Sequence, residues 1–346
     1  MFAVATKIAN STILGLIASA GVADAGRAAS WKEITVDQPF LSDSGEIATD
    51  ISGIACMPPA SGSRTCLVIN DEDQAAQFAT LRENVLSRTT RVRLIDKQTE
   101  KAAVGTPPSG LDCTGGTASF SDLDGEATAY AAPYFYIVGS HGCSRKKAKF
   151  RTSTFVLTRF QVDVAGVIVA PVQASFRLSD ILSGDRFGTY FGKDLDSGGL
   201  NVEGLAIVGD TLYVGLRAPS LDGVAGIAVG SIEALFASGH DKIRDARPMM
   251  SVPLGPDTGI RDLAALPDGR LLILGGPSQN QKNPYRIFLL DPSKPDKTDQ
   301  LLALEDPPGK AEALLYLGQE DNSWRLMLMF DGPENGAPRE YRVPVP

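Results

Sequence analysis

Acidic residues recur at one place in a repeated pattern of this chain. Each precedes or opens a short apolar segment, a turn and a second apolar segment follow, and the four are Glu126, Glu203, Asp262 and Glu312. Carboxylates brought close together cannot all ionise unless protons, an arginine or a metal cation compensates their charges. Because the chain has only 2 His and 4 Cys, oxygen ligands favour a hard cation such as Ca²⁺. These four acids are therefore candidate calcium ligands.

Polar residues also follow the second apolar segments, and these residues are candidates for catalysis or ligand binding. They are Asn70, Asp71, Ser140, His141, Arg217 and Asp331. We predict catalytic roles for His141, Glu203 and Arg217, with Arg217 or calcium polarising the substrate and an acid of the ring serving as base. Ser140 and Asp331, together with Glu126, Asp262 and Glu312, are predicted to bind the ligand. Ser140 and His141 are neighbours on an extended segment, so their side chains point apart and form no nucleophile–base pair.

One dense basic run stands in an otherwise acidic protein. Residues 143–151 read CSRKKAKFR, and five of the seven residues from 145 to 151 are cations, Lys146 among them. Such a run could attract a phosphate or carboxylate ligand, and Lys146 is taken as its candidate contact. The alternative is a solvated loop.

The recurring units predict the architecture that would gather these residues. Their key positions are 52, 126, 203, 262 and 312, and turn residues such as Gly209-Asp210 and Asp268-Gly269 separate the paired segments. Such spacing is typical of the blades of a β-propeller, and we expect an all-β fold with five blades. A sixth, degenerate blade could lie within residues 74–120 or 150–200. The last unit lacks an outer strand, which residues 31–36 could supply to close the ring.

Strand direction in such a fold would bring the polar residues together. The first strand of each blade lines the central channel, and the second runs back antiparallel to it. The start of the first strand and the end of the second therefore meet at one mouth of the channel. A structural alternative competes with this site, because buried carboxylates often accept backbone N–H bonds between blades, and at least two of the four acids could do so. Gly204 is expected to allow close packing at the axis.

The four cysteines favour an oxidising compartment. They are Cys56, Cys66, Cys113 and Cys143, and no C-x-x-C pair is present. Four cysteines allow three connectivities, and the strand pattern favours Cys56–Cys66 and Cys113–Cys143. The alternative is four separate buried thiols.

Residues 1–25 are typical of a cleaved export signal. Lys7 precedes an apolar stretch over residues 12–22, and Ala23-Asp24-Ala25 provides small residues at a cleavage site. The alternative is a first core helix. We expect residues 26–346 to form a single propeller domain in the periplasm or outside the cell, without a membrane span and as a monomer. The net charge of −8 argues against nucleic-acid binding, which needs cations to displace phosphate counterions.

Several motifs resemble a bacterial protein family of unknown function. They are NVEGLA at residues 201–206, GLRAP at 215–219, GSH at 139–141 and FDGP at 330–333, and the resemblance runs from Ile51 to Pro333. The acid-Gly-Leu-Ala pattern is also similar to esterase-like phytase propellers, whose carboxylates bind calcium and phosphate esters. Ser52 and the pair Asp262-Leu263 depart from that pattern. The closer family implies no activity.

The sequence leaves two classes of function open. One is an exported hydrolase acting on esters or phosphoesters, with water as the nucleophile. The other is a non-catalytic propeller that binds a glycan, a peptide or a partner protein, with every acid of the mouth engaged in hydrogen bonds between blades. Whether the protein is an enzyme, and which small-molecule or polymeric ligand it takes, are not decided by the residues alone.

Overall fold

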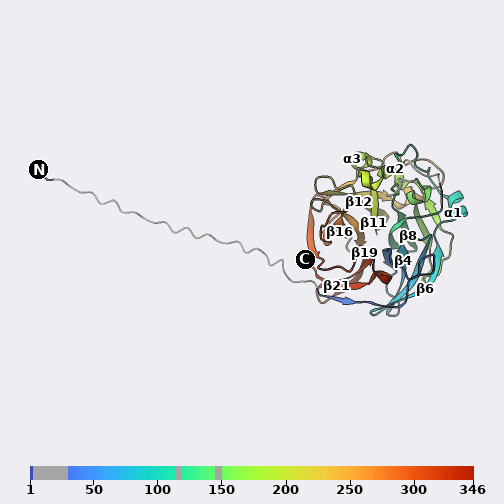
Figure 1. Cartoon of the computed structure of the whole chain (residues 1–346), viewed down its shortest axis with the longest axis horizontal. Helices are drawn as coiled ribbons and strands as arrows, with labels where there is room; N and C mark the ends of the chain where they lie inside the picture. The colour runs from blue at the N-terminus through green and yellow to red at the C-terminus, as the bar shows by residue number, and fades with distance from the viewer. Residues whose placement is uncertain (3–29, 114–118, 145–149) are drawn as a thin grey trace.

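Five β-sheets surround a common axis. The computed structural model describes residues 1–2, 30–113, 119–144 and 150–346, and the view down its shortest axis shows the sheets in a ring (Figure 1). The innermost strands are β3 (Ile51–Cys56), β7 (Gly125–Ala131), β11 (Asn201–Val208), β15 (Thr258–Ala265) and β19 (Lys310–Glu320). Each is in contact with the next, and β19 returns to β3, so the ring is closed. The predicted five-bladed β-propeller is confirmed.

Each blade is a meander of antiparallel strands that continues outward from its inner strand. Blade one adds β4 (Ser63–Asn70), β5 (Ala75–Arg82) and β6 (Val85–Arg93), and blade two adds β8 (Tyr134–Gly139), β9 (Leu157–Gln161) and β10 (Gln173–Ser175). Blade three adds β12 (Thr211–Ala218), β13 (Val224–Ser231) and β14 (Met250–Pro253), and blade four adds β16 (Leu271–Pro277), β17 (Arg286–Leu290) and β18 (Thr298–Ala303). Blade five adds β20 (Ser323–Asp331) and β21 (Arg339–Pro344). The segments considered for a sixth blade supply outer strands of blades one and two instead.

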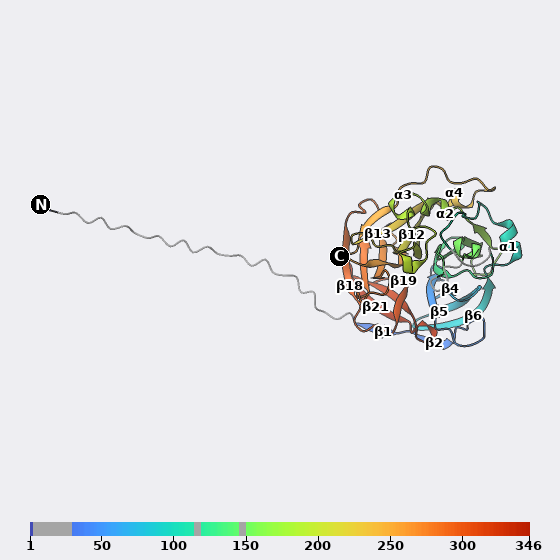
Figure 2. The same cartoon turned by 45° about the horizontal axis from the view of Figure 1, so that its top comes forward.

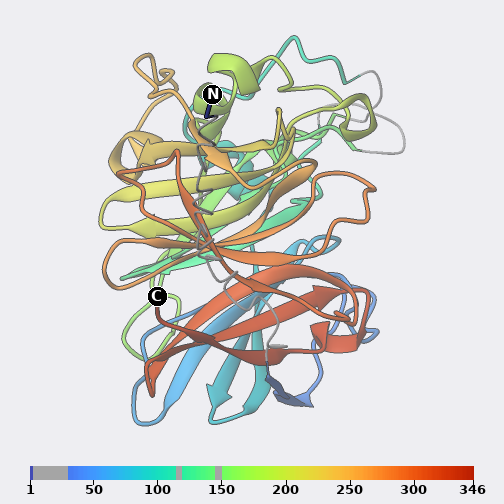
Figure 3. The same ribbon diagram turned by 90° about the vertical axis from the view of Figure 1, so that its left-hand side faces the viewer.

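The N-terminal segment joins the last blade to the first. Strand β1 (Trp31–Glu33) pairs antiparallel with β21, and β2 (Thr35–Gln38) then pairs in parallel with β6 (Figure 3). Ile34, between these two strands, is buried. The predicted closure of the ring by an N-terminal strand is therefore confirmed, and one short segment pairs with the outer strands of both blades.

The core lies between the blades. In the described residues the buried apolar side chains form five clusters, and each cluster fills the gap between one pair of neighbouring blades. Since an inner strand contributes side chains to both neighbours, a single blade cannot bury its apolar faces alone. Gly204 shows how close the packing is near the axis, because a Cβ there would lie 2.9 Å from Ile260 Cγ2.

The helices are short and lie outside the ring. They are α1 (Lys97–Ala102), α2 (Leu178–Leu182), α3 (Asp185–Gly188) and α4 (Ile232–Phe236), with 3-10 turns η1 (Thr152–Phe155), η2 (Leu195–Ser197) and η3 (Glu334–Gly336). Helices α2 and α4 pack against β13 of blade three (Figure 2). Among the described residues, no helix is long and apolar enough to span a bilayer.

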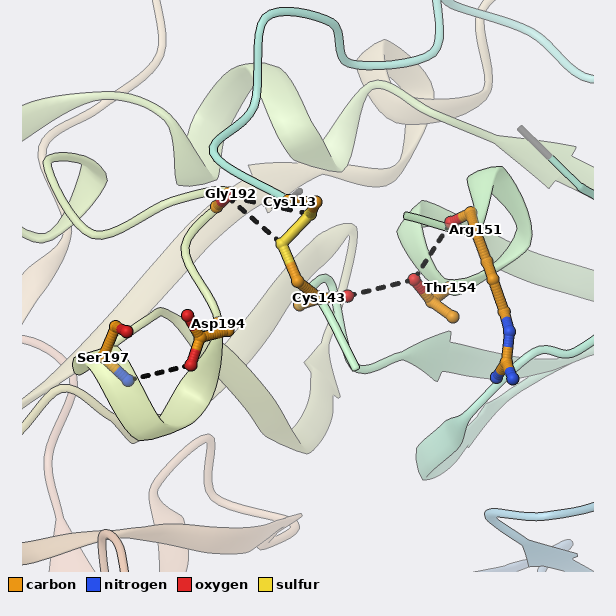
Figure 4. The surroundings of a disulfide bond; sticks show 8 residues. Cys113, Cys143, Arg151, Thr154, Gly192, Asp194 and Ser197 are labelled. Atoms are coloured by element: carbon orange, nitrogen blue, oxygen red, sulfur yellow. Dashed lines mark hydrogen bonds between the residues drawn. A yellow bond between two sulfur atoms is a disulfide. The ribbon is translucent and has the colours of Figure 1, made fainter. Parts of the chain in front are cut away.

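Both predicted disulfides are present. Cys56 and Cys66 face each other across β3 and β4, and Cys113 joins Cys143 just beyond the end of β8 (Figure 4). Beside the second disulfide, the Thr154 hydroxyl donates to the carbonyl oxygen of Gly142 at 3.2 Å. The Cys113–Cys143 bond therefore anchors the loop that follows β8 at the mouth of the channel. Residues 3–25 of the predicted export signal lie outside the described residues.

Candidate functional site

Every inner strand carries a one-residue β-bulge at the same place. At this place in each blade, the register to the second strand skips one residue of the inner strand, and the skipped residues are Ser52, Glu126, Glu203, Arg261 and Glu312. A bulge leaves its extra residue out of the ladder and redirects its side chain. The repeated feature of the fold is therefore a bulge that carries one serine, three glutamates and one arginine around the axis.

The fourth position of this ring differs from the expectation. Sequence comparison aligned Asp262 with the glutamates, whereas the strand register places Arg261 at the bulge. Asp262 Oδ2 accepts the amide of Leu314 and Oδ1 accepts the amide of Leu263, each at 2.7 Å, and the Leu205 amide also bonds to this carboxylate. Asp262 thus ties together the inner strands of three blades, which is the structural role weighed above, and it does not line the cavity described next.

A cavity of about 450 Å³ opens at one mouth of the channel, where inner strands begin and second strands end. Eight carboxylates line it: Asp50, Asp71, Glu72, Asp124, Glu126, Glu203, Glu312 and Asp331. In the described part of the chain, the cationic side chains of Arg151, Arg217 and Lys310 also line it, together with Ser140, Asn201 and Thr154. Strand direction therefore brings six of the predicted site residues into one place: Glu126, Ser140, Glu203, Arg217, Glu312 and Asp331.

His141 and Lys146 lie differently. The His141 side chain is fully buried and does not line the cavity; its Nδ1 lies 2.8 Å from the Gly139 carbonyl oxygen, and its ring meets Phe155 edge-on. Burial lowers the pKa of His141 to about 4, so the imidazole is neutral at pH 7. Lys146 lies outside the described residues.

Arg261 connects two of the ring glutamates. Its side chain is 1% exposed, and Nε lies 2.9 Å from Glu203 Oε2 while Nη2 pairs with Glu312 Oε1. Arg217 reaches Glu203 from the cavity side, with Nη1 at 2.5 Å from Oε1. Burial followed by the charge of Glu203 raises the pKa of Glu312 to about 7, although Arg261 opposes this shift.

The carboxylates of blades one and two have no such partners. Within the described residues, no ion pair involves Asp50, Asp71, Glu72, Asp124 or Glu126. Burial, followed by the charges of Asp124 and Glu312, raises the pKa of Asp71 to about 9. Burial, followed by Glu203 and Asp124, raises the pKa of Glu126 well above its usual value. Among the described residues, these carboxyl groups of blades one and two therefore have no ion-pair partner, whereas Glu203 and Glu312 on the other side of the cavity are ion-paired.

Asp124 has an intermediate character. Its carboxyl group is buried, which raises its pKa to about 6, and the nearby Ser140 hydroxyl limits that rise. Asp124 stands two residues before Glu126 at the start of β7. One strand end thus presents two carboxyl groups that hold their protons over different pH ranges.

Some lining residues were not identified from the sequence. Asp50 precedes its inner strand by one residue, and Lys310 is the first residue of β19. Both therefore lie near the start of an inner strand, where the predicted acids were also found. Asn201 is the first residue of β11 and of the NVEGLA motif, but its neutral amide did not mark it as a candidate site residue. Arg261 was missed because a bulge cannot be aligned by counting residues.

The donor set does not favour a compact metal site. Among the described residues, no group of three or more His, Cys, Asp and Glu side chains is arranged to hold a metal ion. The carboxylates of the mouth are distributed around a cavity, and two of the four predicted ligands, Glu203 and Glu312, are engaged by Arg261.

A family model matches the second half of the chain. The family is described as "Protein of unknown function (DUF3616)", and its model matches residues 165–341. The chain belongs to this family. The matched part includes the NVEGLA and FDGP motifs, whereas GSH at residues 139–141 lies before it. Membership brings no known activity, in agreement with the resemblance seen in the sequence.

The protein is also similar to several solved structures. One is the β-1,3-galactosidase BT0265 of family GH43, at 9% identity and TM-score 0.46; the match covers 91% of this chain and 60% of that one. Another is a mannose phosphorylase from Leishmania mexicana, at 10% identity and TM-score 0.44, covering 92% and 88%. A third is a gluconolactonase from Xanthomonas campestris, at 13% identity and TM-score 0.40, covering 92% and 99%. Similarity at this level says nothing about activity. No curated protein matches the sequence.

Proposed function

We propose that this protein is an exported hydrolase that cleaves an ester or glycosidic bond of a small polar substrate by carboxylate acid–base catalysis. The observation that carries the proposal is the pair Asp124 and Glu126, which line one cavity but experience different environments. Pairs of titratable groups whose surroundings push their pKa values apart are suited to acid and base roles.

Glu126 is the proton donor in this scheme. It has no ion-pair partner in the described part of the chain, and burial with the neighbouring negative charges raises its pKa well above its usual value, which favours the protonated form. Its carboxylic acid can therefore give a proton to the leaving oxygen as the carbon–oxygen bond breaks.

Asp124 is the base. With a pKa of about 6 it is mostly ionised at pH 7, so it can take a proton from water as the water oxygen bonds to the reacting carbon. The acid and base thus exchange protonation states in one turnover, and water restores them. Arg217 lies across the cavity and can donate hydrogen bonds to a substrate oxygen, while Glu203 holds its guanidinium in place. His141 takes no step in this scheme because it does not line the cavity.

Phosphoesters and calcium fit the cavity less well. Among the described residues that line the cavity, carboxylates outnumber cationic groups, so these residues would repel an anionic phosphoester. Because the described acids do not form a metal-holding cluster, no step of the scheme requires calcium. Export is supported by the two disulfides, which persist in oxidising compartments.

Turnover of chromogenic substrates tests the proposal. The purified protein is assayed with nitrophenyl glycosides, nitrophenyl esters and nitrophenyl phosphate, each with calcium and with a chelator. We expect chelator-insensitive release of nitrophenol from a glycoside or ester, and a loss of about 100- to 10,000-fold in kcat/KM in Glu126→Gln. Glu305→Gln, at an exposed position, is the matched control and should keep full activity. Turnover that survives in both Glu126→Gln and Asp124→Asn contradicts the scheme, and a completely inactive panel favours the non-catalytic binder.

A further inference from the structure

Among the described residues, the cationic groups that line the cavity are all paired with carboxylates. Arg151 pairs with Asp122, Arg217 with Glu203 and Lys310 with Asp331. Of the lining carboxylates without an ion pair in the described residues, Asp50, Asp71 and Glu72 come from blade one. We call these three the blade-one acids. None of the described cations of the cavity is free to compensate them.

The blade-one acids are held together by the backbone. The amide of Asp71 donates to the carbonyl oxygen of Asp50 at 3.2 Å, where β4 ends beside the start of β3. Asp50 Oδ2 accepts the Thr49 hydroxyl, whereas Asp71 Oδ1 is enclosed and has no hydrogen-bond partner. Glu72 is exposed at the rim. A cation that entered here would meet carboxyl oxygens from these side chains, and its charge would favour the ionised form of Asp71 over the protonated form that burial favours when no cation is near.

A second unsatisfied acceptor lies elsewhere in the same cavity. The Asn201 side chain is 7% exposed, lines the cavity from blade three, and its Oδ1 has no hydrogen-bond partner. Buried polar atoms in folded proteins are almost always paired, so an orphaned acceptor in a cavity points to a ligand that donates hydrogen bonds. This observation is independent of the acids of blade one.

We propose that the substrate carries a primary ammonium group that the blade-one acids bind, and hydroxyl or amide donors that reach Asn201. The ligand class is a small polar amine, such as an amino sugar. An ammonium group offers three N–H donors and one positive charge. These match the Asp71 oxygen that has no donor and the three carboxyl groups that have no ion-pair partner among the described residues. A compact metal ion matches them less well, because no three of the described acids converge on one point. The inference extends the proposed function to a substrate class, but binding can be measured without turnover.

Matched amines and alcohols test the proposal. Binding of glucosamine is compared with glucose, and binding of 1,4-diaminobutane with 1,4-butanediol, by calorimetry and thermal melting at pH 7. At least one amine should bind about tenfold or more tightly than its neutral counterpart, as one charge-assisted contact implies. Asp71→Asn should abolish this preference. Glu72→Gln should reduce it, and because Glu72 is exposed this substitution should leave the fold intact. Glu305→Gln should leave it unchanged.

Three results separate the outcomes. Equal binding of each amine and its neutral counterpart overturns the inference. Stabilisation by calcium chloride alone, lost in Asp71→Asn, overturns it in favour of a metal site. Amine binding that persists in Glu126→Gln supports it even if no substrate is turned over, so its failure and that of the proposed hydrolase remain distinguishable.

Discussion

Arg261 Nε lies 2.9 Å from Glu203 Oε2, although the two residues belong to different blades and are 58 positions apart. Both occupy the bulge of their inner strand, and Arg261 also reaches the bulge residue of blade five, Glu312. One buried guanidinium therefore holds three neighbouring blades together at the axis. The ion-paired side of the cavity is a consequence of this contact.

Removing Arg261 should destabilise the fold strongly. In Arg261→Met, Glu312 loses its ion-pair partner and Glu203 keeps only Arg217, and breaking a buried ion pair from one side costs about 3–5 kcal/mol. Urea unfolding at pH 8 measures the loss. Adding Glu312→Gln to this variant should recover part of it, because one uncompensated charge is removed. The control Lys297→Ala breaks an exposed pair with Asp299 and should change stability by less than about 1 kcal/mol; an equal effect in both variants would contradict the role of Arg261.

Stability should fall as the pH rises from about 4 to 9. The pKa of Asp71 is raised from 3.8 to about 9 in the folded protein, chiefly by burial, so in this range the folded state binds a proton that the unfolded chain releases. The stabilisation is complete below the unfolded pKa and is lost as the pH approaches the folded value, at up to about 1.4 kcal/mol per pH unit. Asp71→Asn should flatten the slope measured by urea unfolding between pH 5 and 8, whereas Asp299→Asn, at an exposed position, should leave it as it is.

A hydrolytic activity should show a bell-shaped dependence on pH. Protonation of Asp124 removes the base, so kcat/KM should decline below about pH 6. Ionisation of Glu126, whose pKa is raised well above its usual value, should remove the acid at a pH higher than that at which a free glutamate ionises. Asp124→Asn should abolish the acidic limb and Glu126→Gln the alkaline limb in the residual rate. If both limbs persist unchanged in the two variants, other groups carry the protons.

The two disulfides should contribute unequally to stability. Loop-closure entropy predicts about 3–4 kcal/mol for Cys113–Cys143, which encloses 30 residues, and about 2–3 kcal/mol for Cys56–Cys66, which encloses 10. Paired Cys→Ser variants, compared by chemical denaturation without reductant, measure both. The Cys113–Cys143 variant should also bind ligands more weakly, because Cys143 lines the cavity.

His141 should matter for folding more than for chemistry. Its backbone has a φ of +51°, a region that asparagine tolerates and β-branched residues avoid, and its buried ring packs on Phe155. We expect His141→Asn to lower the melting temperature while keeping kcat within a few-fold, and His141→Val to be far less stable. A loss of kcat in a folded His141→Asn protein would restore the catalytic role predicted from the sequence.

The position of the site could be predicted from residues alone, but its internal pairing could not. Glu126, Glu203 and Glu312 stand at equivalent places in repeated units, and strand direction sends all of them to one mouth. In blade four the bulge residue is Arg261 and not Asp262. The sequence pattern does not show where a bulge lies, so counting residues along the repeat misplaced this position by one. The Asp262 carboxylate consequently accepts backbone N–H groups of its own strand and of the next blade.

The blade number, the closing N-terminal strand, both disulfides and the acidic mouth could be predicted from the residues, because these features follow from local patterns repeated along the chain. Which acids are paired and which keep their protons became visible only in the folded ring. A carboxylate's charge depends on burial and on groups from other blades, and those distances exist only after the ring has closed.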